Sequence, residues 1–347
     1  MNSVVSIVDC RPGDVLAKDV YWKNILILPA NTLLTETLIE KLKQTDVTNV
    51  TIALPRQEEQ EISHTVHPIE HFQLEYKENA NVLKNVINDL AAGRELRVDR
   101  LSGVFDSVYQ QISHNCWLMD CINSIRSADL YTYTHSLNVA LYCGLIARWM
   151  RLPDQEIKDV IQAGVLHDMG KSQVPQEILN KKGKLTVEEF EAMKRHSVIG
   201  YRLVIRVPEL KAEVCNAVLL HHERMDGNGY PFGLVGDEIP LYAKIIAVAD
   251  VYDALTSERV YKKRITPFDT FREFQELGYD SFDPQVLLVF LENIANYYTG
   301  AKVRLNTGEV GEITTILPQY IDKPIVRVGD RILDLAGEPQ YRIVEML

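Results

Sequence analysis

Apolar residues recur at helical spacing through the middle of the chain and at strand spacing near both ends. Between residues 104 and 300 they repeat every three or four positions, which predicts helices that bury one face. Residues 1–60 combine short β-rich runs with one short amphipathic run at 35–44. Beyond residue 300, short alternating runs are separated by turn residues. The expected fold is therefore mainly α, with a small N-terminal α/β unit and a small C-terminal antiparallel β unit.

Breaks in this pattern indicate where the parts meet. A polar, acidic stretch at 57–61 interrupts the apolar pattern and is typical of a linker. Helices that precede a larger helical domain often pair with a second subunit, so a homodimer through them is expected. The expected parts are an N-terminal unit, a helical linker, a helical domain and a β unit, at residues 1–60, 61–103, 104–300 and 301–347.

The composition is that of a globular protein in water. Hydrophobic residues make up 46% of the 347 positions and charged residues 24%. The N-terminus lacks the basic and apolar segments of a signal peptide, and no apolar run approaches the roughly 20 residues that cross a bilayer. The 5 cysteines form no C-x-x-C pair, and their odd number argues against a disulfide framework. A cytoplasmic protein with reduced thiols and no membrane span is expected.

The net charge of −11 restricts the ligands of this chain. Binding to a nucleic-acid polymer requires a basic surface, so an acidic chain is not expected to do this. A small phosphate anion would require metal ions or a few fixed cations to reverse the charge locally.

Histidines and aspartates lie on the inward faces of several predicted helices. His135 shares a stripe with Val139 and Ile146, and Asp168 ends the apolar stripe of the next helix. A lone inward histidine is more often a hydrogen-bonded core residue than a ligand, but a buried carboxylate is costly unless it is paired or bound to metal. Several such residues in one helical core favour a metal site. They are His135, His167, Asp168, His196, His221, His222 and Asp250.

Two of these histidines, His221 and His222, are adjacent and are followed at once by a Gly-rich turn. Neighbouring side chains on a helix diverge by about 100°. One metal ion would have difficulty using both imidazoles, whereas two ions close together could each take one. A helix end at which histidines meet exposed carbonyl groups would explain the pair equally well. The other inward histidines and aspartates favour the metal site.

Three blocks of sequence resemble the HD superfamily of phosphohydrolases and its HD-GYP branch. Residues 167–171, HDMGK, match the H-D-x-G-K signature. Residues 221–231, HHERMDGNGYP, are similar to the motif that names the branch, and residues 249–261 match its next block. The likeness covers residues 104–300. Proteins of this branch are metal-dependent phosphodiesterases that linearise cyclic di-GMP, so the resemblance implies that activity and an all-helical HD-type domain.

The resemblance also implies which residues hold metal. The general HD set would be His135, His167, Asp168 and Asp250. A second metal would be held by three further histidines, with Asp168 bridging: His196, His221 and His222. The family's trinuclear members carry a glutamate where this chain has Tyr131, so two divalent ions are expected and a third is not. Iron or manganese is the expected metal.

Catalysis would then use a hydroxide that bridges the two ions and attacks phosphorus, while the ions bind the phosphate oxygens. Asp168 and Lys171 are the expected catalytic residues, and Asp226 and Asp253 are candidates for orienting the ligand imidazoles. The expected product is linear pGpG, or GMP if cleavage continues. Substrate contacts are expected from Lys171, Tyr230, Pro231, Arg259 and Lys262.

Other interpretations of these residues stay open. Arg259 and Lys262 would also suit a solvated helix end, and Tyr230 and Pro231 a purely structural turn. The substrate could be another cyclic dinucleotide such as cyclic GMP-AMP, because the motif residues act on the phosphate and do not choose the base. A non-catalytic receptor for cyclic di-GMP is a further alternative, which the complete ligand set disfavours.

Overall fold

The computed structural model describes residues 2–11, 13–22, 25–28, 32, 34, 36–43, 47–53, 68–114, 118, 122, 131–181, 183–256, 266–277 and 280–347. These residues form two compact units, Met1–His71 and Phe72–Leu347. The predicted linker at 57–61 lies outside the described residues. Each unit is described by itself.

The N-terminal unit combines short strands with one short helix. Its strands pair in two antiparallel two-stranded sheets, β1 with β4 and β2 with β3. Buried Leu16, Ile39 and Val50 belong to its small apolar core. The expected α/β unit is confirmed. Its elements are β1 (Asn2–Ser6), η1 (Ile7–Asp9), β2 (Val20–Trp22), β3 (Ile25–Leu28), α1 (Glu36–Lys43) and β4 (Asn49–Ala53).

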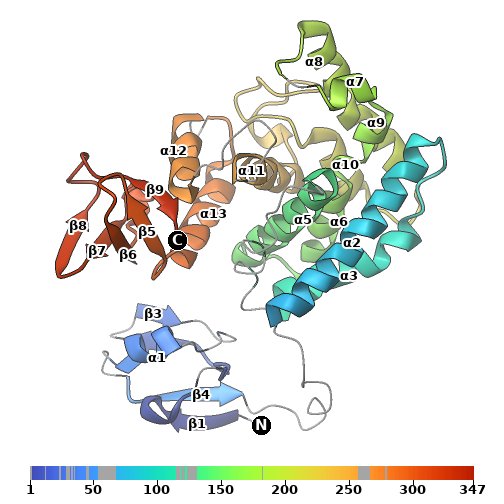
Figure 1. The fold of residues 1–347 in the computed structure, drawn as a ribbon. Coiled ribbons are helices and arrows are strands. Elements are labelled where there is room, and N and C mark those ends of the chain that lie inside the picture. Colours follow the sequence, from blue (N-terminus) through green and yellow to red (C-terminus); the bar gives the residue numbers. More distant parts are fainter. Residues whose placement is uncertain are drawn as a thin grey trace. The chain divides into compact units, whose positions relative to one another are not determined.

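The second unit is helical through most of its length, which confirms the mainly α expectation (Figure 1). None of the helices among the described residues is long and apolar enough to cross a membrane. Its helices are α2 (Pro68–Ala91), η2 (Val98–Leu101), α3 (Ser102–His114), α5 (Tyr131–Trp149), α6 (Asp154–Leu166), η4 (Met169–Gln173), α7 (Gln176–Leu179), α8 (Val187–Lys194), α9 (His196–Val204), α10 (Ala212–Leu220), η5 (Gly236–Glu238), α11 (Leu241–Thr256), α12 (Pro267–Leu277) and α13 (Pro284–Tyr297).

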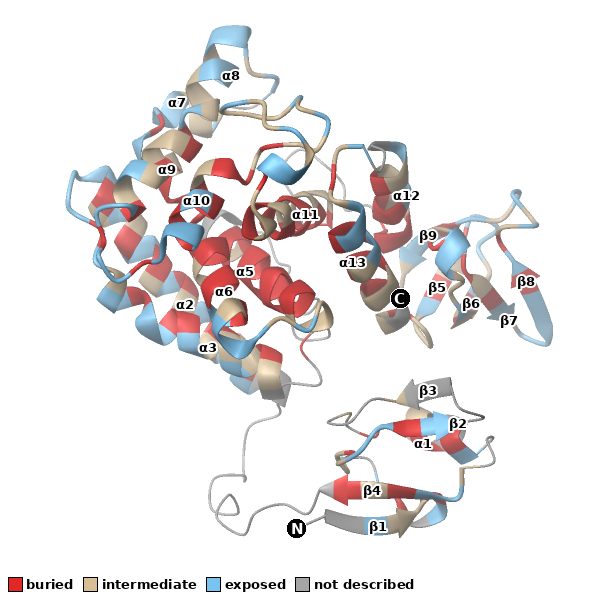
Figure 2. Cartoon of the chain, turned by 180° about the vertical axis from the view of Figure 1, so that it is seen from behind, coloured by how far each residue is buried: buried red, intermediate tan, exposed pale blue. Residues whose placement is uncertain are grey.

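Helix α5 is the core of this unit. Its residues 135–147 are all buried, which explains why its sequence is apolar on most sides. Buried positions also dominate α11, which packs against α5 (Figure 2). The rings of Tyr142 on α5 and Tyr252 on α11 meet edge to face with centroids 5.0 Å apart, and Phe290 on α13 packs on both. This aromatic cluster joins α5, α11 and α13 into one core.

Two glycines set how closely the helices approach near the inward histidines. A Cβ on Gly164 of α6 would lie 2.9 Å from the Cα of Ala140 on α5. A Cβ on Gly170 of η4 would lie 1.9 Å from the carbonyl oxygen of His196 on α9. Neither position has room for a side chain, so glycine is required for both close approaches. The second approach holds the start of η4, and with it Asp168, against α9.

Helices α2 and α3 lie side by side and are joined by polar contacts. The hydroxyl of Ser107 on α3 donates to a carboxylate oxygen of Glu75 at 2.7 Å and accepts from the amide of Asn79 at 2.8 Å. The amide of Gln111 donates to the other carboxylate oxygen of Glu75 at 2.5 Å. This face of α2 is therefore occupied within the unit, while Leu74 lies 57% exposed on another face.

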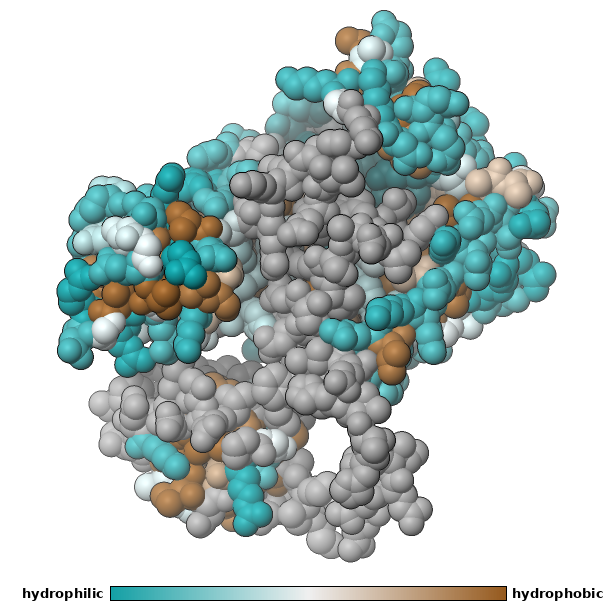
Figure 3. Space-filling model, in the orientation of Figure 1, coloured by the Kyte–Doolittle hydropathy of each residue, from teal (hydrophilic) through white to brown (hydrophobic). Residues whose placement is uncertain are grey.

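The C-terminal strands form one antiparallel sheet in the order β8-β7-β6-β5-β9, as expected for this part of the chain. One face buries Val303, Ile313 and Val326 completely. Hydrophobic residues also gather on the surface of the sheet (Figure 3), where Val310 and Ile332 are exposed. The elements are β5 (Lys302–Leu305), β6 (Val310–Thr315), η6 (Pro318–Tyr320), β7 (Ile325–Val328), β8 (Arg331–Asp334) and β9 (Ile343–Met346).

Candidate metal centre

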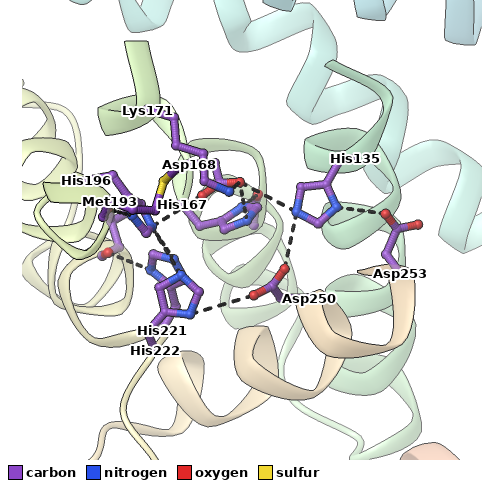
Figure 4. A network of polar contacts seen from close by, with 12 residues as sticks. His135, His167, Asp168, Lys171, Met193, His196, His221, His222, Asp250 and Asp253 are labelled. Atoms are coloured by element: carbon purple, nitrogen blue, oxygen red, sulfur yellow. Dashed lines mark hydrogen bonds and ion pairs between the residues drawn. The ribbon is translucent and has the colours of Figure 1, made fainter. Parts of the chain in front are cut away.

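All seven side chains expected to hold metal meet at one place in the helical unit (Figure 4). They come from helices that are distant in sequence, and the histidines are almost completely buried except for His222. Helix α5 contributes His135, and the junction of α6 and η4 contributes His167 and Asp168. The first residue of α9 is His196, His221 and His222 follow the end of α10, and Asp250 lies in α11.

The potential ligand atoms form two groups, and within each group they all lie within 4.8 Å of one another. Asp168 contacts both groups. Its Oδ2 lies 3.5 Å from Nε2 of His135 and 3.3 Å from Nε2 of His167, and its Oδ1 lies 3.5 Å from Nε2 of His196. A carboxylate in this position is suited to bridge two cations. One group is His135, His167 and Asp250, and the other is Asp168, His196, His221 and His222.

Backbone carbonyl groups orient three of the histidines. Nδ1 of His167, His196 and His221 lies 2.7, 2.7 and 2.8 Å from the carbonyl oxygen three residues earlier in the chain. A carbonyl oxygen only accepts, so each Nδ1 carries the hydrogen and each Nε2 presents a lone pair. All three Nε2 atoms point into the centre (Figure 4). This is the tautomer that binds a metal through Nε2.

The unpaired atoms of the centre fit metal ions. Among the described residues, Nε2 of His167 and Oδ1 of Asp168 are buried without any hydrogen-bond partner. Nε2 of His196 lies 3.3 Å from Nε2 of His221 and 3.1 Å from Nε2 of His222. The first of these distances brings two lone pairs together, because both Nδ1 atoms hold the hydrogen. A cation between these acceptors would satisfy them, whereas without one they are costly to bury.

The protonation states also suit metal binding. Burial lowers the pKa of His221 and His222 well below the usual value, so both stay neutral. Burial raises the pKa of Asp168 and Asp250, but His167 and Lys171 beside Asp168, and His135 beside Asp250, outweigh that effect and hold both pKa values well below the ordinary range. Neutral imidazoles and ionised carboxylates are the forms that coordinate metals.

His135 differs from the other histidines because it sits between carboxylates. Burial lowers its pKa, but hydrogen bonds to Asp250 and Asp253 outweigh burial and raise the pKa to about 10. Its Nε2 lies 3.2 Å from Oδ1 of Asp250, and its Nδ1 lies 2.7 Å from Oδ2 of Asp253. In the metal-free protein both ring nitrogens of His135 therefore carry a hydrogen, and a metal ion would displace the one on Nε2.

The residues expected to contact substrate lie on the edge of this centre where the structure describes them. Nζ of Lys171 donates to Oδ2 of Asp168 at 2.6 Å, and its side chain is 27% exposed. The ring of Tyr230 lies 4.6 Å from the ring of His222, next to Pro231 in the turn. Burial raises the pKa of the Tyr230 hydroxyl, and Asp168 adds to this effect. Arg259 and Lys262 lie outside the described residues.

The turn that carries Tyr230 is held by Glu223, a residue for which the sequence suggested no role. Glu223 is 2% exposed, and its carboxylate accepts from the backbone N–H of Phe232 at 2.7 Å and of Leu234 at 3.0 Å. The backbone N–H of Tyr230 donates to the carbonyl of His222 at 3.2 Å. A glutamate directly after two inward histidines was the available signal, because a carboxylate there must find donors.

Of the two aspartates considered for orienting ligands, only Asp253 contacts one. Its second oxygen accepts from the amide of Asn138 at 2.8 Å. The expectation for Asp226 was wrong. Its Oδ1 accepts from the backbone N–H of Asn228 at 2.9 Å and its Oδ2 from the hydroxyl of Ser281 at 3.5 Å. Asp226 shapes the turn, because an aspartate side chain readily bonds the backbone two residues ahead.

Comparison with known proteins agrees with this geometry. Residues 118–286 match the family model described as HD domain, which places an HD domain in this part of the helical unit. Such domains bind divalent metals. The chain is also similar to named enzymes of the HD-GYP type, which confirms the resemblance in the three sequence blocks.

Two curated relatives and one solved structure show the extent of the likeness. A cyclic di-GMP phosphodiesterase from Pseudomonas aeruginosa is 36% identical over 244 residues, which are 70% of this chain and 59% of the relative. A 3'3'-cGAMP-specific phosphodiesterase from Vibrio cholerae is 35% identical over 172 residues, which are 49% of this chain and 33% of the relative. The chain thus spans less than two thirds of either relative's length. The structure of an HDG"Y"P protein from Bdellovibrio bacteriovorus has a TM-score of 0.54 at 13% identity, over 85% of this chain and 99% of that one, which shows a shared fold.

Proposed function

We propose that this protein is a metal-dependent phosphodiesterase that hydrolyses cyclic di-GMP to linear pGpG. The observation that carries the proposal is the pair of adjacent ligand groups, one of which contains Asp168 while the other lies in contact with it, together with buried acceptors that lack hydrogen-bond partners. Two adjacent cation sites are the arrangement that phosphoryl-transfer enzymes use to bind a phosphate and activate water. The names of the curated relatives support the substrate class.

We propose two divalent ions per chain, iron or manganese, which both accept a set of imidazoles and carboxylates. When bound, such ions supply Lewis-acid chemistry, lowering the pKa of a coordinated water and neutralising phosphate oxygens. The protein's own contribution is the orientation of the ligands and the two carboxylate charges of Asp168 and Asp250. Lys171 adds a fixed positive charge at the solvent edge of the centre, where a dianionic substrate would arrive.

Turnover of cyclic di-GMP tests the proposal directly. Protein purified without oxygen should release linear pGpG and contain about two metals per chain. Asp168→Ala should abolish turnover and lower the metal content, since it removes the shared ligand. Asp159→Asn is a matched control, because Asp159 is an equally buried aspartate that pairs with Lys211 at 2.6 Å, away from the centre. Metal-loaded protein that fails to cleave cyclic di-GMP would contradict the proposed reaction.

A second candidate substrate is 3'3'-cyclic GMP-AMP, because some of the similar curated proteins are named for that specificity. Ligands of a metal centre act on phosphate and cannot choose between guanine and adenine. Competition between equal concentrations of the two dinucleotides, with both products quantified, gives the ratio of kcat/KM values. If the kcat/KM value is higher for cyclic GMP-AMP, that dinucleotide and not cyclic di-GMP is the preferred substrate. Tight binding of either dinucleotide without cleavage would instead support a receptor.

We also propose a homodimer formed through the helices that precede the HD domain. The face of α2 that carries Glu75 and Asn79 packs on α3, so another face of α2, with exposed Leu74, would meet the second copy. Light scattering after size-exclusion chromatography should give a mass of two chains. Leu74→Glu should convert it to the mass of one.

A further inference from the structure

We propose that Tyr76 on α2 is a positioning residue for the metal ligand His135, acting through Asn138 and Asp253. The inference rests on the metal centre of the proposed function, although not on its substrate. Tyr76 lies before the region that matches the HD family, residues 118–286, so it adds to the centre from outside that region.

A continuous chain of hydrogen bonds links the four side chains. The hydroxyl of Tyr76 lies 2.6 Å from Oδ1 of Asn138 and 3.0 Å from the carbonyl oxygen of Thr134. Nδ2 of Asn138 donates to Oδ1 of Asp253 at 2.8 Å, and Oδ2 of Asp253 lies 2.7 Å from Nδ1 of His135. Tyr76, Asn138, Asp253 and His135 are all buried. The chain therefore runs from α2 through α5 and α11 back to α5 without reaching solvent.

The chemistry of the side chains sets the direction of the bonds between Asn138, Asp253 and His135. The carboxylate of Asp253 accepts from the NH2 group of Asn138, so the oxygen of Asn138 is turned toward Tyr76. The tyrosine hydroxyl has one hydrogen and faces two acceptors, and the shorter contact, at 2.6 Å, is the one to the Asn138 oxygen, whereas the Thr134 carbonyl lies at 3.0 Å. On its other side, Asp253 must receive the hydrogen of Nδ1, which leaves Nε2 of His135 facing Asp168 and Asp250. Each bond in the chain thus supports the same orientation of the imidazole.

His135 needs this support more than the other oriented histidines do. His167, His196 and His221 are held by a carbonyl three residues earlier, a contact that forms locally within the chain. His135 instead takes its Nδ1 partner from a side chain 118 residues away, on a different helix. A carboxylate side chain can rotate, whereas a carbonyl group in a helix cannot. Asn138 and Tyr76 remove that freedom from Asp253.

Metal affinity tests the relay without any need for turnover. Metal-depleted protein is titrated calorimetrically with Mn²⁺, comparing Tyr76→Phe with the wild type. Loss of a direct orienting partner typically lowers metal affinity 10- to 100-fold, as we expect for Asp253→Asn. Tyr76 acts one step further away, and we expect Tyr76→Phe to weaken Mn²⁺ binding by about tenfold.

Two controls separate positioning from general destabilisation. Tyr298→Phe also removes one buried hydroxyl contact, to Tyr252 at 3.1 Å, and should leave Mn²⁺ affinity unchanged. Ser107→Ala weakens the packing of α2 on α3 but changes none of the hydrogen bonds between Tyr76, Asn138, Asp253 and His135, and it should also leave Mn²⁺ affinity unchanged. If either control weakens binding as much as Tyr76→Phe does, the effect is one of packing and the proposal is overturned.

The double variant Tyr76→Phe with Asp253→Asn decides whether the two residues act in series. A relay predicts that Tyr76→Phe has no further effect once Asp253 is altered, whereas independent roles predict that the two losses multiply. Multiplying losses, or wild-type affinity in Tyr76→Phe, would overturn the proposal. Failure of cyclic di-GMP turnover leaves this result intact, and unchanged Mn²⁺ binding by Asp168→Ala would instead refute the metal centre itself.

Discussion

Replacing Glu223 by glutamine is expected to loosen the turn that carries Tyr230 while leaving the metal ligands in place. The buried carboxylate accepts one backbone N–H on each oxygen, from Phe232 and Leu234. Glutamine has the same shape, but its NH2 group would face one of these N–H groups and cannot accept. The substitution therefore removes one charge-assisted hydrogen bond and weakens the other.

The size of the effect follows from these contacts. A hydrogen bond to a charged group contributes about 1.5–3 kcal/mol when its loss leaves the partner unsatisfied. Phe232 is already 65% exposed, so water can partly satisfy the backbone groups of the opened turn. We therefore expect the substitution to lower the free energy of opening the turn by about 2 kcal/mol. This corresponds to a roughly 30-fold larger open population.

Hydrogen exchange of the turn measures that population. The amides of Phe232 and Leu234 should exchange roughly 30-fold faster in Glu223→Gln, with the metal content unchanged and a higher KM for the cyclic dinucleotide. Glu238→Gln is the matched control, because Glu238 also accepts a backbone N–H of this segment, from Val235 at 2.9 Å, but is exposed. Exchange in Glu223→Gln at the wild-type rate would refute the reasoning, and so would loss of metal.

Four further outcomes follow from the same structure. Gly170→Ala should greatly lower the yield of folded protein or its metal content, because the new Cβ would lie 1.9 Å from a backbone oxygen of His196, and the metal content of the soluble fraction checks this. Asp283→Ala should destabilise the helical unit by about 1 kcal/mol or more in urea unfolding, since Asp283 accepts the first backbone N–H groups of α13, whereas Asp283→Asn keeps that cap. Burial raises the pKa of Asp283, but its bond to Lys244 at 3.0 Å outweighs burial and lowers it, so the charge stabilises the fold above about pH 4 and this part is lost as the pH falls further. Unfolding of Asp283→Asn should accordingly depend less steeply on pH between about 5 and 2 than wild-type unfolding does. Removal of metal with a chelator should lower the unfolding temperature of the wild type and leave that of Asp168→Ala nearly unchanged, as a thermal scan would show.

The sequence by itself determined the fold class and the inward position of the potential ligands. The period of the α-helix decides which side chains share a face, so the stripe of Val139 and Ile146 was enough to turn His135 inward. The same reasoning turned Asp168 and Asp250 inward, and a buried carboxylate requires a cation or a donor wherever it lies. Their role as ligands stays a proposal, although the structure brings all of them together.

Only the tertiary structure decided which side chains hold these ligands in place. Asp226 and Asp253 looked alike in sequence, yet Asp226 shapes a turn and Asp253 orients His135. The bond from Tyr76 to Asn138 spans 62 positions, and no local pattern of apolar and polar residues records it. Periodicity fixes the direction of a side chain relative to its own helix. Which atoms it meets depends on the distance and angle between helices, and these are set by the packing of the whole core.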